Sequence, residues 1–150
     1  MPKLLFRKRW GDPDGMPEER RGKMDLSIYF RSVMEQDSCP VVICNGEHEI
    51  IYMNQAAAAR YAKSGGLGLV GRSIFECHNR KSKEMIERVV SWFRESPENN
   101  KVYTFRSEKE NKDVYMIALR DGEGNLIGYY EKHECRNAEK GNLYQFGQNP

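Results

Sequence analysis

Residues 40–54 read PVVICNGEHEIIYMN, and this stretch decides the fold. Two short runs rich in β-branched residues flank the segment NGEHE. Asn45 followed by Gly46 is typical of a tight turn, because both residues adopt positive φ angles easily. The pattern therefore predicts a β-hairpin that turns at Asn45–Gly46, and it is the strongest local signal in the chain.

A helical pattern precedes the hairpin. Residues 24–36 contain MDLSIYFRSVMEQ, in which apolar side chains recur with the period of a helix and Asp25 can cap the first turn. Such a helix must cover its own sheet or meet another chain. The apolar stripe consists of Leu26, Tyr29, Phe30 and Val33.

Two more helices are expected after the hairpin. Residues 54–66 predict a short Ala-rich helix that Asn54 caps and Gly65–Gly66 ends. Residues 67–79 read as a loop with a helical turn, and residues 81–96 predict a longer amphipathic helix. The apolar face of that helix consists of Met85, Ile86, Val89, Val90 and Phe93.

The next segments alternate and are rich in β-branched and aromatic residues. Residues 101–107, 113–121 and 126–134 predict three consecutive antiparallel strands, joined by turns at EKENK and DGEGN. With the hairpin they make five strands. The sequence thus predicts an α+β fold in which helices pack on one face of a five-stranded antiparallel sheet.

Composition sets limits on organisation and partners. A chain of 150 residues with 39% hydrophobic content suits one domain. We assign residues 1–23 to a basic leader, 24–36 to the first helix, 37–136 to the main domain and 137–150 to a tail. The net charge of +2 gives no field that favours nucleic acid.

The cysteines and the hydropathy pattern indicate a cytoplasmic protein. The four cysteines show no C-x-x-C spacing, so we interpret them as reduced thiols. No stretch approaches the roughly 20 apolar residues that a membrane span requires. The first ten residues, MPKLLFRKRW, have only a three-residue apolar run before their charges, so we do not interpret them as a secretory signal. We expect no membrane insertion.

With this order of elements, the chain resembles a PAS domain, a sensory module in which helices cover one face of a five-stranded antiparallel sheet. The residues that carry the resemblance are CPVVICNGEHEIIYMNQAAAARYA at 39–62, LVGRSIFE at 69–76 and LRDGEGNLIGYYE at 119–131. The resemblance covers about residues 25–135. The stretch GRSIFECHNRKS further resembles a bacterial subgroup with a Cys-His pair before the long helix, although Asn79 stands where that subgroup commonly has proline.

The resemblance implies a signalling part without catalysis. It implies a ligand or cofactor in a cavity between helices and sheet, and a homodimer formed through the N-terminal helix and the sheet. In relatives the output lies in another domain, such as a histidine kinase, a cyclase or a transcription factor. The mechanism we expect is a shift between two populations that depends on occupancy of the cavity.

His78 is the residue whose role is most open. It can ligate haem iron, since a neutral imidazole near an apolar pocket is an iron ligand. It can also satisfy backbone groups with Asn79 where the loop enters the long helix, which is the interpretation we favour. A Cys77–His78 nucleophilic pair, or a metal site joining them to His133 and Cys135, finds less support in the spacing.

The expected cavity wall combines aromatic, Met and small residues. Its occupant is a small apolar or aromatic ligand, haem through His78, or nothing. Two rivals stand beside the sensor: a ligand-free interaction module, and a small enzyme that uses His78 with Glu76 or Glu84. His48 and His133 are expected to be solvated. The predicted ligand-binding residues are His78, Phe75, Met53, Tyr61, Met85, Val89 and Met116.

Overall fold

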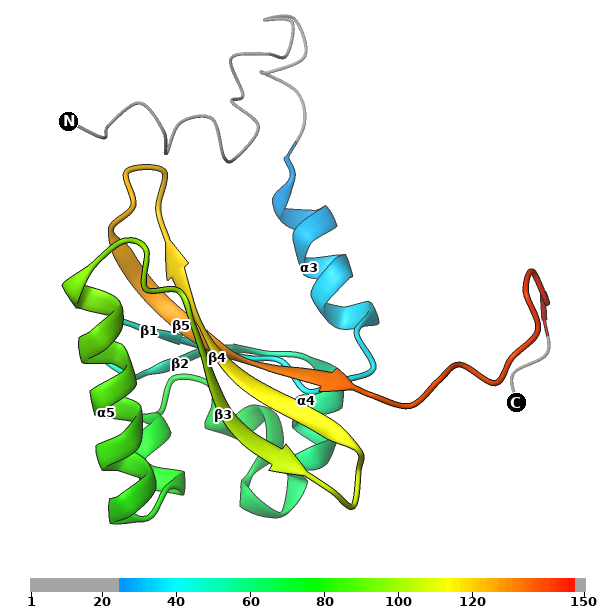
Figure 1. Ribbon diagram of the computed structural model, residues 1–150, viewed down its shortest axis with the longest axis horizontal. Helices are drawn as coiled ribbons and strands as arrows, with labels where there is room; N and C mark the ends of the chain where they lie inside the picture. The colour runs from blue at the N-terminus through cyan, green and yellow to red at the C-terminus, as the bar shows by residue number, and fades with distance from the viewer. Residues whose placement is uncertain (1–24, 148–150) are drawn as a thin grey trace, which may run out of the picture.

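The computed structural model describes residues 25–147 (Figure 1). The leader predicted at residues 1–23 lies outside the described residues. Within them the chain forms three α-helices, five strands and three short 3₁₀ helices. The elements are α3 Ser27–Gln36, β1 Val42–Asn45, β2 Ile50–Met53, α4 Gln55–Arg60, η2 Ala62–Ser64, η3 Gly66–Leu69, η4 Ile74–Cys77, α5 Arg80–Glu95, β3 Lys101–Ser107, β4 Lys112–Arg120 and β5 Leu126–Cys135.

The five strands form one antiparallel sheet in the order β2-β1-β5-β4-β3. Strands from the two ends of the domain are therefore neighbours at its centre, where Ile43 of β1 pairs with Tyr130 of β5. Helices α4 and α5 lie on one side of this sheet and α3 lies on the other (Figure 1). The α+β class and the antiparallel sheet are confirmed.

The β1–β2 turn differs from the predicted one. Positive φ occurs at His48 (66°), and neither Asn45 nor Gly46 adopts it. The Asn45 side chain closes a longer loop, since its Oδ1 accepts hydrogen bonds from the backbone N–H groups of Glu47 (3.0 Å) and Glu49 (2.9 Å). Asparagine thus acts through its side chain, and the left-handed position falls three residues later.

Helix α5 forms where its amphipathic pattern predicts. Asn79 caps it by accepting a hydrogen bond from the Ser82 N–H at 2.9 Å. Val90 and Phe93 are completely buried against the inner face of the sheet. The buried cluster also contains Cys44, Ile50, Met53, Ala57, Leu69, Val89, Met116 and Tyr129.

Arg120 fixes the other end of α5 to the sheet. Its Nη2 donates hydrogen bonds to the backbone carbonyls of Phe93 (2.7 Å), Ser96 (3.0 Å) and Asn99 (2.9 Å). The last carbonyls of a helix have no partner within the helix, so a guanidinium at this point satisfies them. Residue 120 ends β4, so these hydrogen bonds join the C-terminal end of α5 to the sheet.

Helix α3 touches the rest of the domain mainly at its C-terminal end. Glu35 accepts hydrogen bonds from the Tyr52 hydroxyl (2.7 Å) and the Gln55 N–H (3.2 Å). None of its residues is buried. Within residues 25–147, no helix combines the length and apolar character needed to cross a membrane.

The segment after β5 carries no helix or strand through residue 147. The side chains of Leu143, Tyr144 and Phe146 are almost fully exposed there. Arg136, at the start of the segment, pairs with Asp113 of β4 at 2.6 Å. The sheet therefore holds the beginning of this segment.

Candidate functional site

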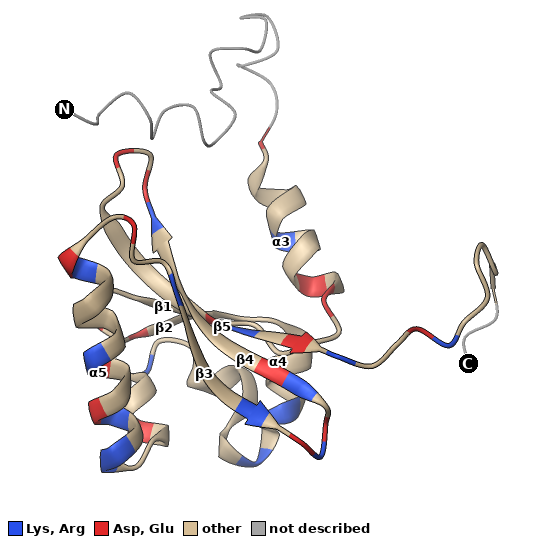
Figure 2. Ribbon diagram, in the orientation of Figure 1, with Lys and Arg blue, Asp and Glu red and all other residues tan. Residues whose placement is uncertain are grey.

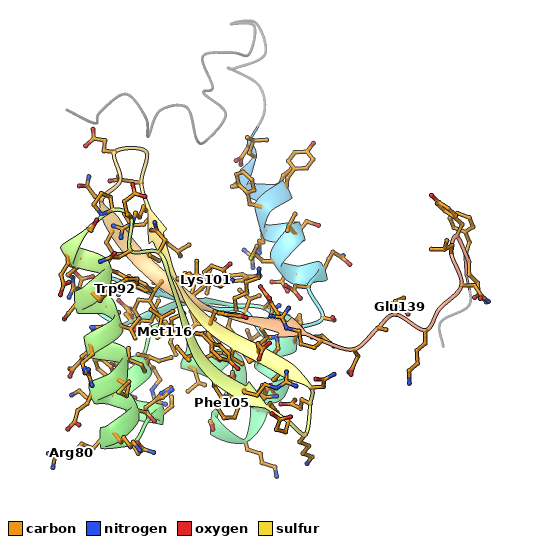
Figure 3. All side chains as sticks on the ribbon, in the orientation of Figure 1. Arg80, Trp92, Lys101, Phe105, Met116 and Glu139 are labelled. Atoms are coloured by element: carbon orange, nitrogen blue, oxygen red, sulfur yellow. The ribbon has the colours of Figure 1, made fainter. Side chains whose placement is uncertain are left out.

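A cavity of about 300 Å³ lies between the sheet and the helices that cover its inner face. Strands β1, β2, β4 and β5 form one wall, and the segments from α4 to α5 form the other. Figure 3 shows Met116 between the sheet and α5, whereas Arg80 at the start of α5 points away from the domain. The lining residues are Val42, Cys44, Ile50, Met53, Tyr61, Ser64, Leu69, Ile74, Cys77, His78, Ile86, Met116, Tyr129 and Glu131.

Four of the seven residues predicted to bind a ligand line this cavity. They are Met53, Tyr61, His78 and Met116.

The other three lie around the cavity without lining it. Phe75 packs its ring against the His48 ring at a centroid distance of 4.5 Å. Val89 belongs to the packed cluster, and Met85 is 48% exposed on the outer side of α5. The apolar face predicted for the long helix was therefore one residue too wide, because Ile86 lines the cavity and Met85 is exposed.

His78 stands at the junction of η4 and α5. Its Nδ1 lies 2.8 Å from the backbone carbonyl oxygen of Ile74. A carbonyl only accepts, so Nδ1 carries the proton, and Nε2 of the neutral ring keeps its lone pair. Together with the Asn79 cap, this contact gives the backbone role that we favoured from the sequence.

The carboxylates next to His78 are paired with arginines. Glu76 binds Arg72 at 2.6 Å, and Glu84 binds Arg80 at 2.9 Å. Neither acid forms a hydrogen bond with His78 within residues 25–147. The acid-base pair that the enzyme hypothesis requires is not assembled in this arrangement.

His48 is not solvated as predicted but half-buried beside Tyr129, whose side chain lines the cavity. Its Nδ1 lies 2.8 Å from the Tyr129 hydroxyl, and its ring packs against Phe75. Burial lowers the pKa of His48, and the charge of Arg94 adds to this effect. The positive φ at residue 48 turns this side chain inward, which no pattern of polarity in the sequence indicates.

His133 is also buried, in contrast to its predicted exposure. Its Nε2 donates a hydrogen bond to Glu131 Oε1 at 2.8 Å, and no hydrogen bond reaches its Nδ1 from the described residues. Alternation along β5 places Tyr129, Glu131 and His133 on the inner face. Sequence reasoning missed Glu131, although this alternation could have found it.

The residues that line the cavity show whether haem or a metal ion would fit there. The free Nε2 of His78 suits an axial haem ligand, but among residues 25–147 no lysine or arginine lines the cavity to pair with the carboxylates of a haem. Among residues 25–147, no three His, Cys, Asp or Glu side chains are grouped so that they could hold a metal ion. The wall fits a small organic ligand better than haem.

The fold is similar to that of several solved structures. No protein-family model matches the sequence, and no curated protein matches it. Among solved structures, the PAS domain of a Colwellia psychrerythraea protein has a TM-score of 0.55 at 12% identity, covering 74% of this chain and 97% of that one. The chain has a PAS fold. Its cavity is the space between the PAS sheet and its helical cover.

Two further structures resemble this PAS module. The C-terminal domain of a Streptococcus mutans protein is 24% identical with a TM-score of 0.56, covering 71% of this chain and 81% of that one. A sensory box sensor histidine kinase from Vibrio cholerae is 13% identical with a TM-score of 0.50, covering 71% and 88%. The subgroup with a Cys-His pair stays a prediction based on Cys77 and His78.

Proposed function

We propose that this PAS module is a sensory domain that binds a small ligand in its inner cavity and signals through its surface. The observation that carries the proposal is the cavity of about 300 Å³ itself, because a completely packed core would leave no space for a ligand. The PAS fold and the histidine kinase neighbour support the same conclusion. We infer no catalysis.

A continuous set of contacts connects the cavity to α3. Met53 lines the cavity, and the next residue, Asn54, is completely buried. The Asn54 Nδ2 donates hydrogen bonds to the carbonyls of Met34 (3.0 Å) and Cys39 (3.0 Å), and its Oδ1 accepts from the Ala57 N–H at 2.9 Å. A ligand that displaces Met53 thereby changes the attachment of α3.

The proposed output surface is the exposed face of α3. Tyr29, Phe30 and Val33 are each more than half exposed, and Leu26 is 43% exposed. Figure 2 shows few charges on α3, whereas α5 carries both signs. An apolar helix face of this kind fits a second copy of the chain, so we propose a homodimer that acts on a partner output domain.

A cavity-filling variant tests the ligand. Ser64 lines the cavity and Lys63 beside it does not, so Ser64→Phe and Lys63→Phe form a matched pair. We expect small aromatic fragments to shift the NMR signals of cavity residues in the unaltered chain and in Lys63→Phe, but not in Ser64→Phe. If fragments shift no cavity signals in any of the three proteins, the sensor proposal is wrong.

The exposed α3 face also supports a second candidate, a ligand-free interaction module. In that case the dimer forms with the same affinity in Ser64→Phe as in the unaltered chain, with or without fragments. Light scattering over a concentration series distinguishes the two candidates. A ligand-dependent dimer affinity that Ser64→Phe abolishes supports the sensor.

Haem is the less favoured occupant. Titration with hemin should give no Soret shift that depends on His78, because the lining residues that the structure describes include no cationic partner for haem carboxylates. His78→Ala is the matched variant. A Soret band that appears in the unaltered chain and is lost in this variant would instead establish His78 as an axial ligand.

A further inference from the structure

The charge of the cavity wall points to one class of ligand. Among the described residues that line it, Glu131 is the only acid, and neither lysine nor arginine is present. An anion that entered would lose its hydration and meet a carboxylate. A cation would pair with that carboxylate and recover part of its lost hydration energy.

Glu131 is held in a defined orientation. The buried His133 side chain, 4% exposed, donates its Nε2–H to Oε1 at 2.8 Å, while the Glu131 side chain is 42% exposed. No hydrogen bond from residues 25–147 reaches Oε2 of Glu131. His133 thus orients the carboxylate through Oε1, and Oε2 is available to a ligand N–H.

Neighbouring groups in the cavity already respond to this negative charge. Burial raises the pKa of Tyr61, and the charge of Glu131 raises it further. Burial raises the pKa of the Cys44 thiol to about 11, and Glu131 again contributes. Both groups therefore remain neutral at pH 7, and the cavity disfavours a second negative charge.

A second acceptor lies on the opposite side. The His78 Nδ1–H is used by the Ile74 carbonyl, which leaves Nε2 as an acceptor on the segment that precedes α5. Glu131 belongs to β5 on the sheet side. Two hydrogen-bond acceptors therefore belong to a mainly apolar wall.

We propose that this cavity binds a small organic cation, with an apolar alkyl or aryl body and a primary ammonium head that pairs with Glu131. The inference rests on the proposed ligand-binding function and specifies its ligand. A volume of about 300 Å³ suits a body of one ring. His133 acts as a positioning residue through the Glu131 carboxylate.

Three probes with the same ring and different heads test the ligand class: 2-phenylethylamine, 2-phenylethanol and phenylacetate. Binding to the full chain is measured by calorimetry at pH 7 and located by NMR. We expect the amine to bind at least tenfold more tightly than the alcohol, and the phenylacetate anion to bind more weakly than either.

Variants on one strand assign this preference to Glu131. Glu131→Gln should bring the affinity for the amine down to that for the alcohol. Glu134→Gln removes the same charge from the opposite face of β5 and should leave the preference intact. His133→Gln should lower the ratio of amine to alcohol affinity while the alcohol affinity stays constant, a result that a purely structural role would not give.

The outcomes separate this inference from the function on which it rests. Equal binding of the amine and the alcohol overturns the ligand class but leaves cavity binding in place. A preference for the amine that survives Glu131→Gln overturns the assignment to Glu131, and binding of no probe counts against both proposals. If Glu131→Gln does not fold, as judged by its amide NMR spectrum, the probe series on the unaltered chain decides alone.

Discussion

The two faces of the PAS sheet differ in how their side chains are covered. On the inner face, Met116 and Tyr129 are buried beneath the helical cover. On the outer face, Tyr52, Ile43, Tyr130 and Ile117 form a row across neighbouring strands that is only partly covered. The inner face stabilises the domain and encloses the cavity, whereas the outer face keeps a partly exposed row of apolar side chains.

The largest effect is expected from opening the inner face. Phe93→Ala removes a completely buried ring from α5 and should lower the free energy of unfolding by about 3–5 kcal/mol. Trp92→Ala is the control, because the neighbouring ring is 39% exposed, and it should cost less than half as much. Urea denaturation measures both. Equal losses would contradict the assignment of the inner face as the stabilising core.

Asn54 tests whether the two faces are coupled. Asn54→Ala leaves the N–H groups of Val41 and Ala57 without the Oδ1 acceptor, so we expect the free energy of unfolding to fall by about 2–4 kcal/mol. It also removes the hydrogen bond to Met34, so amide exchange in α3 should accelerate more than in α5. Uniform acceleration in both helices would show that Asn54 does not couple α3 to the sheet.

The proposed dimer surface on α3, which lies on the outer side of the sheet, is tested by charge. Tyr29→Glu with Phe30→Glu should give a monomer by light scattering and change the free energy of unfolding of that monomer by less than about 1 kcal/mol, since neither ring is buried. Arg31→Glu is the control on the same helix. A dimer that persists in the double variant places the interface on another surface.

The smallest effect concerns pH and His48. Because burial lowers the pKa of His48 in the folded state, the unfolded chain binds more protons between that lowered value and about 6.5. The contribution of the neutral, buried His48 to the free energy of unfolding is complete above about pH 6.5, and it is lost as the pH falls through this window. His48→Asn, which tolerates positive φ, should flatten the dependence of stability on pH between 7 and 5. An unchanged slope would assign the titration to another group.

The fold followed from local patterns that do not depend on distant contacts. The runs before and after Asn45–Gly46, the period of α5 and the alternation of β3 to β5 each agree with the structure. The turn was wrong because the Asn45 side chain bonds two backbone N–H groups, a choice that dipeptide preference cannot reveal. Strand order could be assigned only through the PAS resemblance, since pairing of β1 with β5 joins distant segments.

The site was less predictable than the fold. Aromatic and Met residues identified part of the wall. Glu131 was missed because a carboxylate suggests a surface position, although alternation with Tyr129 along β5 places it on the inner face. The two histidines were misjudged for different reasons. His133 is buried because its strand, β5, lies between β1 and β4 in the sheet. His48 is turned inward by its positive φ angle. The predicted roles of α3 and of the ligand remain proposals.

The central position of β1 and β5 has a mechanical consequence. The strands are antiparallel, and the start of β1 at Val42 pairs with Glu131 near the end of β5. A force that pulls apart the segment before β1 and the segment after β5 acts on the same end of this strand pair. The hydrogen bonds between the two strands would then break one after another, and not all together as they would under shear. Once the contacts of Asn54 and Arg136 with these segments are broken, a pulling force would separate the sheet between β1 and β5, two strands that both line the cavity.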